Sequence, residues 1–310
     1  MAPSLVPDDE RARRGVLYGA AAYLLWGLFP LYWPLLEPAG AVEILAHRVL
    51  WSLLTVAVLL VVARDLRWLR EVGGRRLALL AAAAVVIAVN WGTYIYGVLS
   101  GNVVETSLGY FINPLVTVLF GVVLLGERLR PLQWVAVGTA AVAVVVLTVD
   151  YGRPPWIALV LAVSFGTYGL LKKTAGVDAV RSLTVETAVL APLAAGWLVW
   201  LEVAGGGGTF ARAGALQAGL LVATGLVTAV PLLAFGAAAI RVPLVTIGLL
   251  QYLAPVMQFL LGVLWFREAM PASRLAGFAL VWLALAILTA DTLRARRRAL
   301  LVRRAATAAA

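Results

Sequence analysis

The chain has 310 residues, of which 63% are hydrophobic and 13% charged, with a formal net charge of +10. Soluble domains carry about 25% charged residues, so this composition excludes a soluble protein. A membrane-spanning helix needs about 20 mostly apolar residues, and the apolar content suffices for about ten of them. We therefore expect an all-α integral membrane protein.

Ten apolar runs follow one another along the chain, each close to the length of a membrane span. The first run is too long for a signal peptide and lacks a clean small-residue cleavage site, so we expect it to remain in the protein. The expected spans lie near residues 16–34, 41–63, 77–99, 103–126, 131–149, 155–173, 180–203, 214–238, 243–266 and 271–290.

The distribution of basic residues predicts the orientation of these spans, because short cytoplasmic loops are enriched in lysine and arginine. With a cytoplasmic N-terminus, the cytoplasmic segments hold most of the 25 basic residues, including six arginines from Arg294 to Arg304. The opposite side holds only Arg153, Arg212, Arg267 and Arg274. We expect both termini in the cytoplasm. The spread of the arginines between apolar runs favours topology signals over a nucleic-acid partner.

Two segments 141 residues apart resemble each other, NPLVTVLFGVVLLGER and APVMQFLLGVLWFREA. The matched residues are Pro114 with Pro255, Gly121 with Gly262, and Glu127 with Glu268. If each half has five spans, the second copy enters the membrane from the other side, as in many transporters. The alternative is chance similarity between helices rich in Leu, Val and Gly.

The repeat predicts four parts of the chain. These are a cytoplasmic N-terminal tail at 1–14, a first five-helix repeat at 15–150, a second at 151–292, and a basic cytoplasmic C-terminal tail at 293–310. Within the spans, Pro30, Pro114, Pro231 and Pro255 predict kinks, because proline lacks a backbone donor. Glycines such as Gly15, Gly19 and Gly262 allow close helix packing.

Charged side chains inside the spans need an explanation, because each costs roughly 2.5–3.5 kcal/mol at mid-helix. They are Glu43, Arg48, Glu105 and Glu186, and His47 shares a helix face with Glu43. We interpret Glu43, His47, Arg48 and Glu186 as gating or coupling residues, with Glu186 as a candidate proton carrier. The alternative is a set of ion pairs or tethers that only lock helices together.

Polar and aromatic residues form stripes on the third, fourth and ninth spans. A small-molecule cavity is mostly apolar and aromatic, with a few polar groups that fix orientation. Hydrogen bonding between helices is the alternative role. The predicted substrate-binding residues are Trp26, Asn90, Trp91, Tyr94, Tyr110, Asn113, Tyr168, Gln251, Tyr252 and Gln258.

Several long strings resemble one transporter family. They are EILAHRVLWSL at 43–53, ETSLGYFINPLVTVLFGVVLLGERLRPLQW at 105–134, SFGTYGLLKK at 164–173, LTVETAVLAPLA at 183–194 and TIGLLQYLAPVMQFLLGV at 246–263. The chain is similar over essentially its whole length to the RarD branch of the EamA group, in the drug/metabolite transporter superfamily. Two local departures are Lys172-Lys173, where arginine then lysine is expected, and the long linker Gly205–Gly208.

This resemblance implies ten helices in two inverted halves, a central substrate cavity, a bacterial inner-membrane location and permeases connected with chloramphenicol sensitivity. The expectation of a transporter agrees with the kinds of metal site and enzyme that the residue types exclude. The chain has no cysteine and one histidine, which removes thiolate and most histidine metal sites, so we expect no cofactor and no metal. It also lacks HExxH, GxSxG and P-loop motifs, so we expect no enzyme.

We therefore predict a secondary transporter that exposes one central site alternately to each side of the membrane. Its partners would be the lipid bilayer and a small amphipathic solute, which we expect to be aromatic, such as a chloramphenicol-like drug. Protons are a candidate coupling ion, and the oligomeric state is left open. A membrane-embedded enzyme with an unrecognised active site is the alternative, and a receptor or scaffold is a third class.

Overall fold

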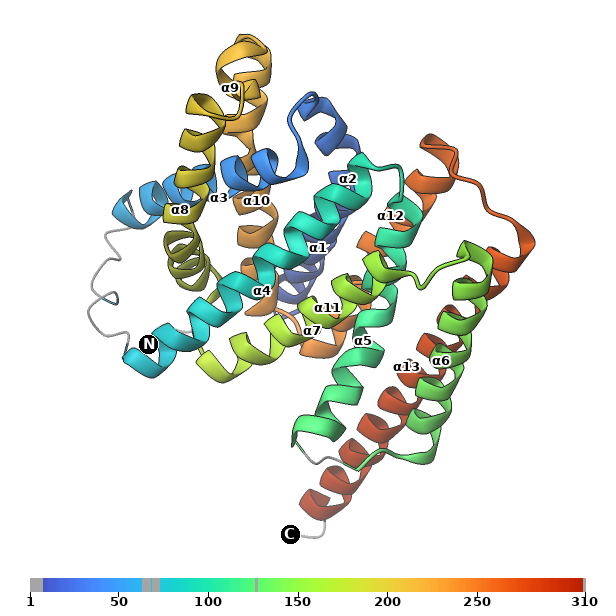
Figure 1. The fold of residues 1–310 in the computed structure, drawn as a ribbon. Coiled ribbons are helices and arrows are strands. Elements are labelled where there is room, and N and C mark those ends of the chain that lie inside the picture. The colour runs from blue at the N-terminus through green and yellow to red at the C-terminus, as the bar shows by residue number, and fades with distance from the viewer. Residues whose placement is uncertain (1–7, 63–67, 69–72, 126–127, 309–310) are drawn as a thin grey trace. The chain divides into compact units, whose positions relative to one another are not determined.

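The computed structural model describes residues 8–62, 68, 73–125 and 128–308, and every regular element in these residues is a helix (Figure 1). The elements up to residue 151 are α1 (Asp8–Gly27), α2 (Phe29–Tyr32), the 3-10 turn η1 (Trp33–Leu36), α3 (Ala41–Val62), α4 (Gly74–Leu99), α5 (Val103–Leu125) and α6 (Pro131–Tyr151). The later elements are α7 (Trp156–Ala175), α8 (Ala179–Val203), α9 (Thr209–Arg212), α10 (Ala215–Ala239), α11 (Leu244–Leu250), α12 (Leu253–Leu260), the π-helical turn η3 (Leu261–Trp265) and α13 (Ala272–Ala308).

Within the described ranges, nine helical segments are long and apolar enough to cross a membrane, and a bent pair of helices at the N-terminal end makes a tenth. In that pair, Ala12–Gly27 and Phe29–Leu36 meet at an angle of 41°. The expected all-helical architecture is confirmed. Glu127, the loop arginines Arg64, Arg67 and Arg70, and residues 1–7 lie outside the described residues.

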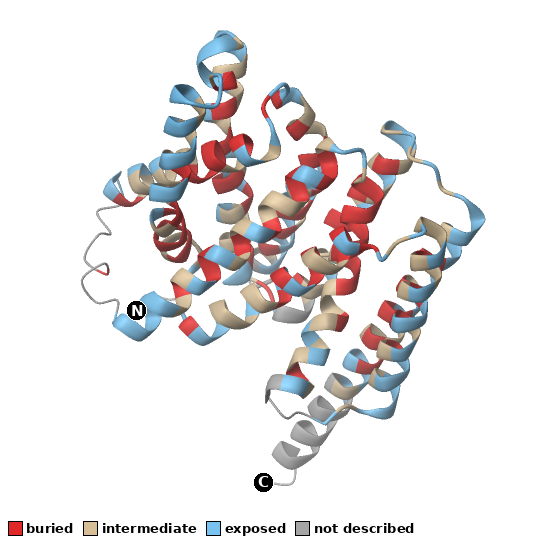
Figure 2. Ribbon diagram, viewed as in Figure 1, coloured by how far each residue is buried: buried red, intermediate tan, exposed pale blue. Residues whose placement is uncertain are grey.

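Exposed residues recur along the long helices (Figure 2), and many of them are large apolar residues. Leu54 of α3, Val142 of α6 and Val199 of α8 are each more than half exposed. A soluble protein does not present apolar surface of this extent to water. Acyl chains provide the apolar surroundings that these faces need, and the chain is therefore a multi-pass membrane protein.

The first span is interrupted at Leu28, two residues before Pro30. Because proline has no amide hydrogen, it cannot bond the carbonyl four residues earlier, which belongs to Trp26. The chain changes direction there, from α1 into α2 and η1.

The ninth span, expected near 243–266, is also interrupted. α11 ends at Leu250 and α12 begins at Leu253, so Gln251 and Tyr252 lie at the break. Pro255 again cannot bond the carbonyl four residues earlier, here that of Gln251. Pro114 and Pro231 lie inside helices α5 and α10, which are continuous. A proline is therefore not sufficient for a break in this chain.

The helices group into two compact units. The first unit comprises Met1–Ser107 and Thr167–Glu268, and the second Leu108–Gly166 and Ala269–Ala310. α5 and α7 contribute to both. Each unit holds segments of both predicted repeats, so the division near residue 150 stays a prediction.

In the first unit, α3 packs against α8 and α10, and α1 packs against α10 and α12. α3 and α8 run antiparallel, since Ala46 clusters with Ala194 whereas Leu60 clusters with Val185. Close packing at α1 depends on glycine. A Cβ on Gly15 would lie 2.6 Å from Val242 Cγ1, and one on Gly19 would lie 2.7 Å from Leu250 Cδ1.

In the second unit, α6 packs along α13 (Figure 1). A Cβ on Gly277 would lie 2.5 Å from the side chain of Leu147, so the two helix backbones approach closely at this point. The ring of Trp282 meets those of Phe278 and Phe111 edge to face. Glycine and aromatic packing hold this unit together.

Candidate functional site

Arg48 of α3 lies in an aromatic enclosure inside the first unit. Only 3% of its surface is exposed. The guanidinium carbon lies 3.9 Å from the ring centre of Trp91 and 5.2 Å from that of Trp33, and Nε donates a 3.0 Å hydrogen bond to Thr228 Oγ1. Phe29 completes the enclosure at 5.6 Å. Elements α2, η1, α3, α4 and α10 therefore all contribute to the surroundings of one charged group.

These contacts suit arginine more than lysine. A planar guanidinium stacks on an aromatic face while its edge donates hydrogen bonds, whereas an ammonium is more strongly hydrated and costs more to desolvate. Cation–π contacts of a desolvated cation contribute about 2 kcal/mol. Trp91 and Arg48, predicted separately as a binding and a coupling residue, are thus brought into direct contact.

The two interrupted spans meet through a side chain in the first unit. Gln258 of α12 donates from Nε2 to the carbonyl of Trp26 at 3.2 Å, which is the carbonyl that Pro30 leaves without a helical donor. A Cβ on Gly27 would lie 2.7 Å from Met257 Cβ, so the backbones are close there. Gln258 is 3% exposed, and its Oε1 has no hydrogen-bond partner among the described residues.

Aromatic rings surround this junction. Tyr23 and Trp26 pack edge to face at 5.3 Å between ring centres, and Phe235 of α10 lies 5.9 Å from Trp26. Gln251 and Tyr252 are half-buried at the break between α11 and α12. The junction therefore combines a turn between two helices, amide side chains and aromatic rings.

The remaining predicted binding residues of the first unit have differing surroundings. Asn90 and Tyr94, one turn apart on α4, are buried at 1% and 3% exposure. Tyr168 lies on α7 and donates to Glu186. Trp91, by contrast, is partly exposed.

Tyr110 and Asn113 of α5 belong to the second unit. Tyr110 packs edge to face on Phe165, with ring centres 5.8 Å apart. Asn113 Oδ1 is buried without a hydrogen-bond partner in the described part of the chain, and a Cβ on Gly166 would lie 3.6 Å from it. An unsatisfied buried amide oxygen is unusual in a protein interior. Asn113 and Gln258 share this property.

Glu186 of α8 is 1% exposed and accepts three hydrogen bonds in the first unit. The donors are Tyr168 Oη at 3.0 Å, Lys172 Nζ at 3.1 Å and Ser182 Oγ. Lys172 also donates to Ser182. The carboxylate is thus held between α7 and α8, and a tether between these helices is the arrangement present in this conformation.

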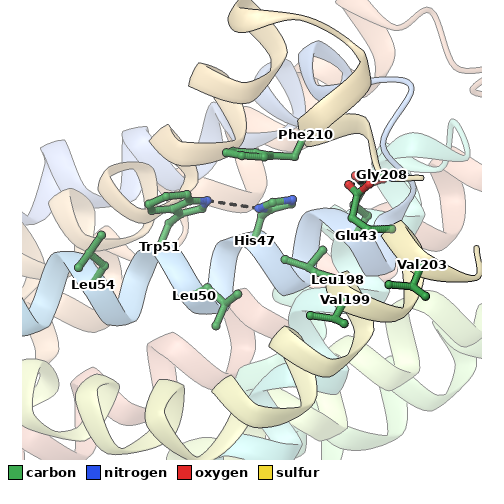
Figure 3. A pocket seen from close by; sticks show the side chains of 11 residues that line it. Glu43, His47, Leu50, Trp51, Leu54, Leu198, Val199, Val203, Gly208 and Phe210 are labelled. Atoms are coloured by element: carbon green, nitrogen blue, oxygen red, sulfur yellow. Dashed lines mark hydrogen bonds between the residues drawn. The ribbon is translucent and has the colours of Figure 1, made fainter.

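Glu43 and His47 belong to the first unit. They lie in the first two turns of α3, beside the short helix α9. They line a cavity of about 450 Å³ together with residues of α8 and α9 (Figure 3). Arg48, the next residue along α3, points instead into the aromatic enclosure. The predicted coupling residues therefore occupy three separate places: the cavity, the enclosure and the Glu186 cluster.

Across the residues that the structure describes, no group of three or more His, Asp or Glu side chains is placed to hold a metal ion. Glu105, the remaining intramembrane acid, is buried at 1% exposure in the first turn of α5.

Comparison with known proteins identifies the family. Residues 13–149 match the model of the EamA-like transporter family. Protein RarD of Streptomyces exfoliatus is 60% identical over 292 residues, which cover 94% of this chain and 92% of that protein. This chain belongs to the RarD family of EamA-type transporters. The resemblance inferred from the sequence strings is thereby confirmed.

Two further similarities extend this result. The chloramphenicol-sensitive protein RarD of Pseudomonas aeruginosa is 37% identical, over 92% of this chain and 96% of that protein. A solved crystal structure shares the fold at 21% identity and a TM-score of 0.56, and the match covers 88% of this chain and 97% of that one. The protein is therefore a membrane transporter of the RarD family, with a fold already seen in a crystal.

Sequence reasoning missed several residues that this RarD-family structure brings to the candidate sites. Thr228, the partner of Arg48, gives no sequence signal, because it is one hydroxyl among many in an apolar helix. Lys172 could have been found, since a lysine in the last turn of one span can reach an acid about two turns into the next. Glu202 lies in the last turn of α8, and Phe210 lies in the linker that follows it. From the sequence, these segments were considered only for the orientation of the spans.

Proposed function

We propose that this RarD-family protein is a secondary transporter of the bacterial inner membrane that works by alternating access. Its solute is a small amphipathic aromatic molecule, with chloramphenicol-like compounds as the first candidates. The proposed binding residues are those predicted from the sequence. Trp26, Gln251 and Gln258 lie at or near the interrupted spans, and Trp91 contacts Arg48.

The observation that carries this proposal is the hydrogen bond from Gln258 to the Trp26 carbonyl. It joins two spans that are both interrupted by proline. Interrupted helices near mid-membrane are the usual location of transporter binding sites, because their free backbone groups can bind a solute. A short break is also a place where a span can change direction between two conformations.

The chemistry of the junction supports an aromatic solute. Trp26, Tyr23 and Phe235 offer ring faces, and Gln258 Oε1 is an acceptor without a partner in the described residues. Aromatic faces with a few amides suit molecules that combine a ring with hydroxyl or amide groups. The printed name of the Pseudomonas aeruginosa relative connects that protein with chloramphenicol, which makes this drug the first compound to test.

We further propose two inverted five-helix halves with cytoplasmic termini. The antiparallel packing of α3 with α8 supports this proposal, because these helices hold equivalent positions in the two predicted halves. The absence of cysteine offers a direct test. A cysteine introduced as Ser100→Cys should react with a membrane-impermeant maleimide only from outside. A cysteine introduced as Arg297→Cys should react only from inside.

Transport itself is tested with the purified protein in liposomes. Preloaded unlabelled chloramphenicol should accelerate entry of the labelled drug, and this counterflow should be absent from empty liposomes. Chemical change of the drug without flux would support the membrane-enzyme alternative. Flux at two pH values, with and without a proton gradient, tests whether protons are coupled.

A further inference from the structure

The cavity beside α9 is separate from the residues proposed for the transported solute. The lining residues that matter here are Glu43, His47, Trp51, Glu202, Gly208 and Phe210. Its volume of about 450 Å³ falls in the range of small-molecule sites. Leu54, Val199 and Val203, which also line it, are 52%, 63% and 82% exposed, so the cavity is open along an apolar edge.

Three stacked rings form one wall of this cavity (Figure 3). Phe210 stacks on His47 with ring centres 5.1 Å apart and on Trp51 at 6.2 Å. Trp51 Nε1 donates to His47 Nδ1 at 3.2 Å, so this nitrogen accepts a hydrogen bond and carries no proton. The imidazole is therefore neutral in this arrangement, and the wall is an uncharged aromatic surface.

Two carboxylates lie together at the other end of the cavity. Glu43 accepts hydrogen bonds from Thr209 N at 2.6 Å and from Thr209 Oγ1 at 3.0 Å, and Glu202 accepts one from Gly208 N at 3.0 Å. A Cβ on Gly208 would lie 2.7 Å from a Glu202 oxygen and 3.2 Å from a Glu43 oxygen, so the two carboxylates are neighbours.

Glu43, Glu202 and Arg212 lie around Gly207 and Gly208, so two acids and one base leave this end with one net negative charge. Arg212 of α9 directs its guanidinium to the carbonyl oxygen of Gly206 in the preceding loop. The donors to the two carboxylates are backbone amides and a hydroxyl, which carry no net charge. Two adjacent negative charges beside an aromatic wall favour a cation, because both ring faces and carboxylates attract one.

We propose that this cavity binds an amphipathic organic cation that enters from the lipid. Its aromatic or alkyl body lies against Phe210 and Trp51, and its cationic nitrogen approaches Glu202 and Glu43. A phospholipid fits less well, because its phosphate would be repelled by the neighbouring carboxylates. The site extends the protein's binding capacity beyond the proposed transport site and shares none of the residues proposed to bind the transported solute.

Binding can be measured without any flux. The probe is a fluorescent styryl dye with an N-methylpyridinium group, titrated by anisotropy against the protein in nanodiscs of a zwitterionic lipid. The uncharged pyridine analogue of the dye is the matched ligand control. We expect saturable binding of the cation and at least tenfold weaker binding of the neutral analogue.

Two variants locate the site. Glu202→Gln keeps an oxygen that accepts from Gly208 N, so it should fold, and Phe210→Leu removes the stacked ring. Each should raise the Kd of the cation about tenfold, the effect of losing roughly 1.4 kcal/mol of binding free energy. Glu37→Gln, an exposed acid in the loop before α3, should leave the Kd unchanged.

Several outcomes would overturn the proposal. A non-saturable signal would mean that the dye partitions into lipid. An unchanged Kd in Glu202→Gln would show that this carboxylate does not bind the cation. An equal rise in Kd in Glu37→Gln would indicate a general effect of surface charge. If Phe210→Leu fails to fold, the Glu202→Gln variant and the neutral dye still test the proposed site. Loss of drug counterflow with dye binding intact would count against the proposed transport function and leave this site standing.

Discussion

Asp150 of α6 accepts a 2.8 Å hydrogen bond from Arg274 Nε of α13. Directly before the first residue of α6, Arg130 Nε donates to Asp291, near the middle of α13, at 2.8 Å. Asp150 and Asp291 are 141 positions apart, the offset at which the two predicted repeats match. The two ion pairs therefore form a reciprocal arrangement between antiparallel helices, which supports the proposed inversion.

The pairs should differ in their contribution to stability. The side chain of Asp150 is 4% exposed and that of Arg274 is 18% exposed, whereas Arg130 is 46% exposed. We expect Asp150→Ala to lower the free energy of unfolding by about 2 kcal/mol, since charge-assisted hydrogen bonds are lost in a buried place. Asp291→Ala should cost about 1 kcal/mol, nearer the value of exposed pairs. Thermal unfolding in detergent measures both, and an equal effect would contradict the assignment.

The Gln258 contact predicts a loss of both stability and flux. Gln258→Leu leaves the Trp26 carbonyl without its donor, which costs about 1–3 kcal/mol when the carbonyl stays buried. We expect a lower Tm and slower drug counterflow in liposomes. Thr139→Val, at an exposed hydroxyl on α6 that bonds only its own helix, is the control and should change neither. Normal flux in Gln258→Leu would remove this junction from the transport path.

Arg48 predicts a strict requirement for guanidinium. Arg48→Lys keeps the charge but loses the planar stacking on Trp91 and the Nε bond to Thr228. We expect the initial rate of drug entry to fall about tenfold, with membrane insertion unchanged. Arg153→Lys is the control, because Arg153 contacts Tyr151 at 5.5 Å outside the enclosure. Equal activity of Arg48→Lys and the native protein would show that charge alone suffices.

A substitution at Glu186 distinguishes a proton carrier from a static tether between α7 and α8. If Glu186 carries a proton, Glu186→Gln should keep drug counterflow but abolish accumulation driven by a proton gradient. Glu37→Gln should behave as the native protein. If Glu186→Gln retains gradient-driven accumulation and only lowers Tm, then the contact with Lys172 is a tether and the proton moves elsewhere.

Asn113 and Gln251 are predicted binding residues that take no part in the Gln258–Trp26 hydrogen bond. Asn113→Ala and Gln251→Ala should each raise the KM for drug entry while leaving protein yield and insertion intact. The reason for Asn113 is its buried Oδ1, which has no partner among the described residues and is available to a solute. Gln251 lies at the turn between α11 and α12, and its carbonyl receives no helical hydrogen bond because the residue four positions later is Pro255. Unchanged kinetics in both variants would place the solute elsewhere.

The sequence by itself determined the membrane class, the helical fold and the approximate spans, because hydrophobicity along a chain is a local property that the bilayer selects directly. It also indicated the family, since long strings such as SLGYFINP and GLLQYLAP are specific. Prolines predicted kinks at four positions, but interruption occurred only near Pro30 and Pro255. Whether a span breaks depends on the neighbouring helices, which must bond the freed carbonyls.

Only the tertiary structure decided which groups meet. Thr228 bonds Arg48 from 180 positions away, Gln258 reaches Trp26 across 232 positions, and Phe210 of the linker helix covers His47. Local periodicity gives the face on which a residue lies and carries no information about its partner on another helix. The packing of the helices determines these partners. Each buried polar group needs a hydrogen-bonding atom within about 3 Å, and only a few arrangements of the helices provide one.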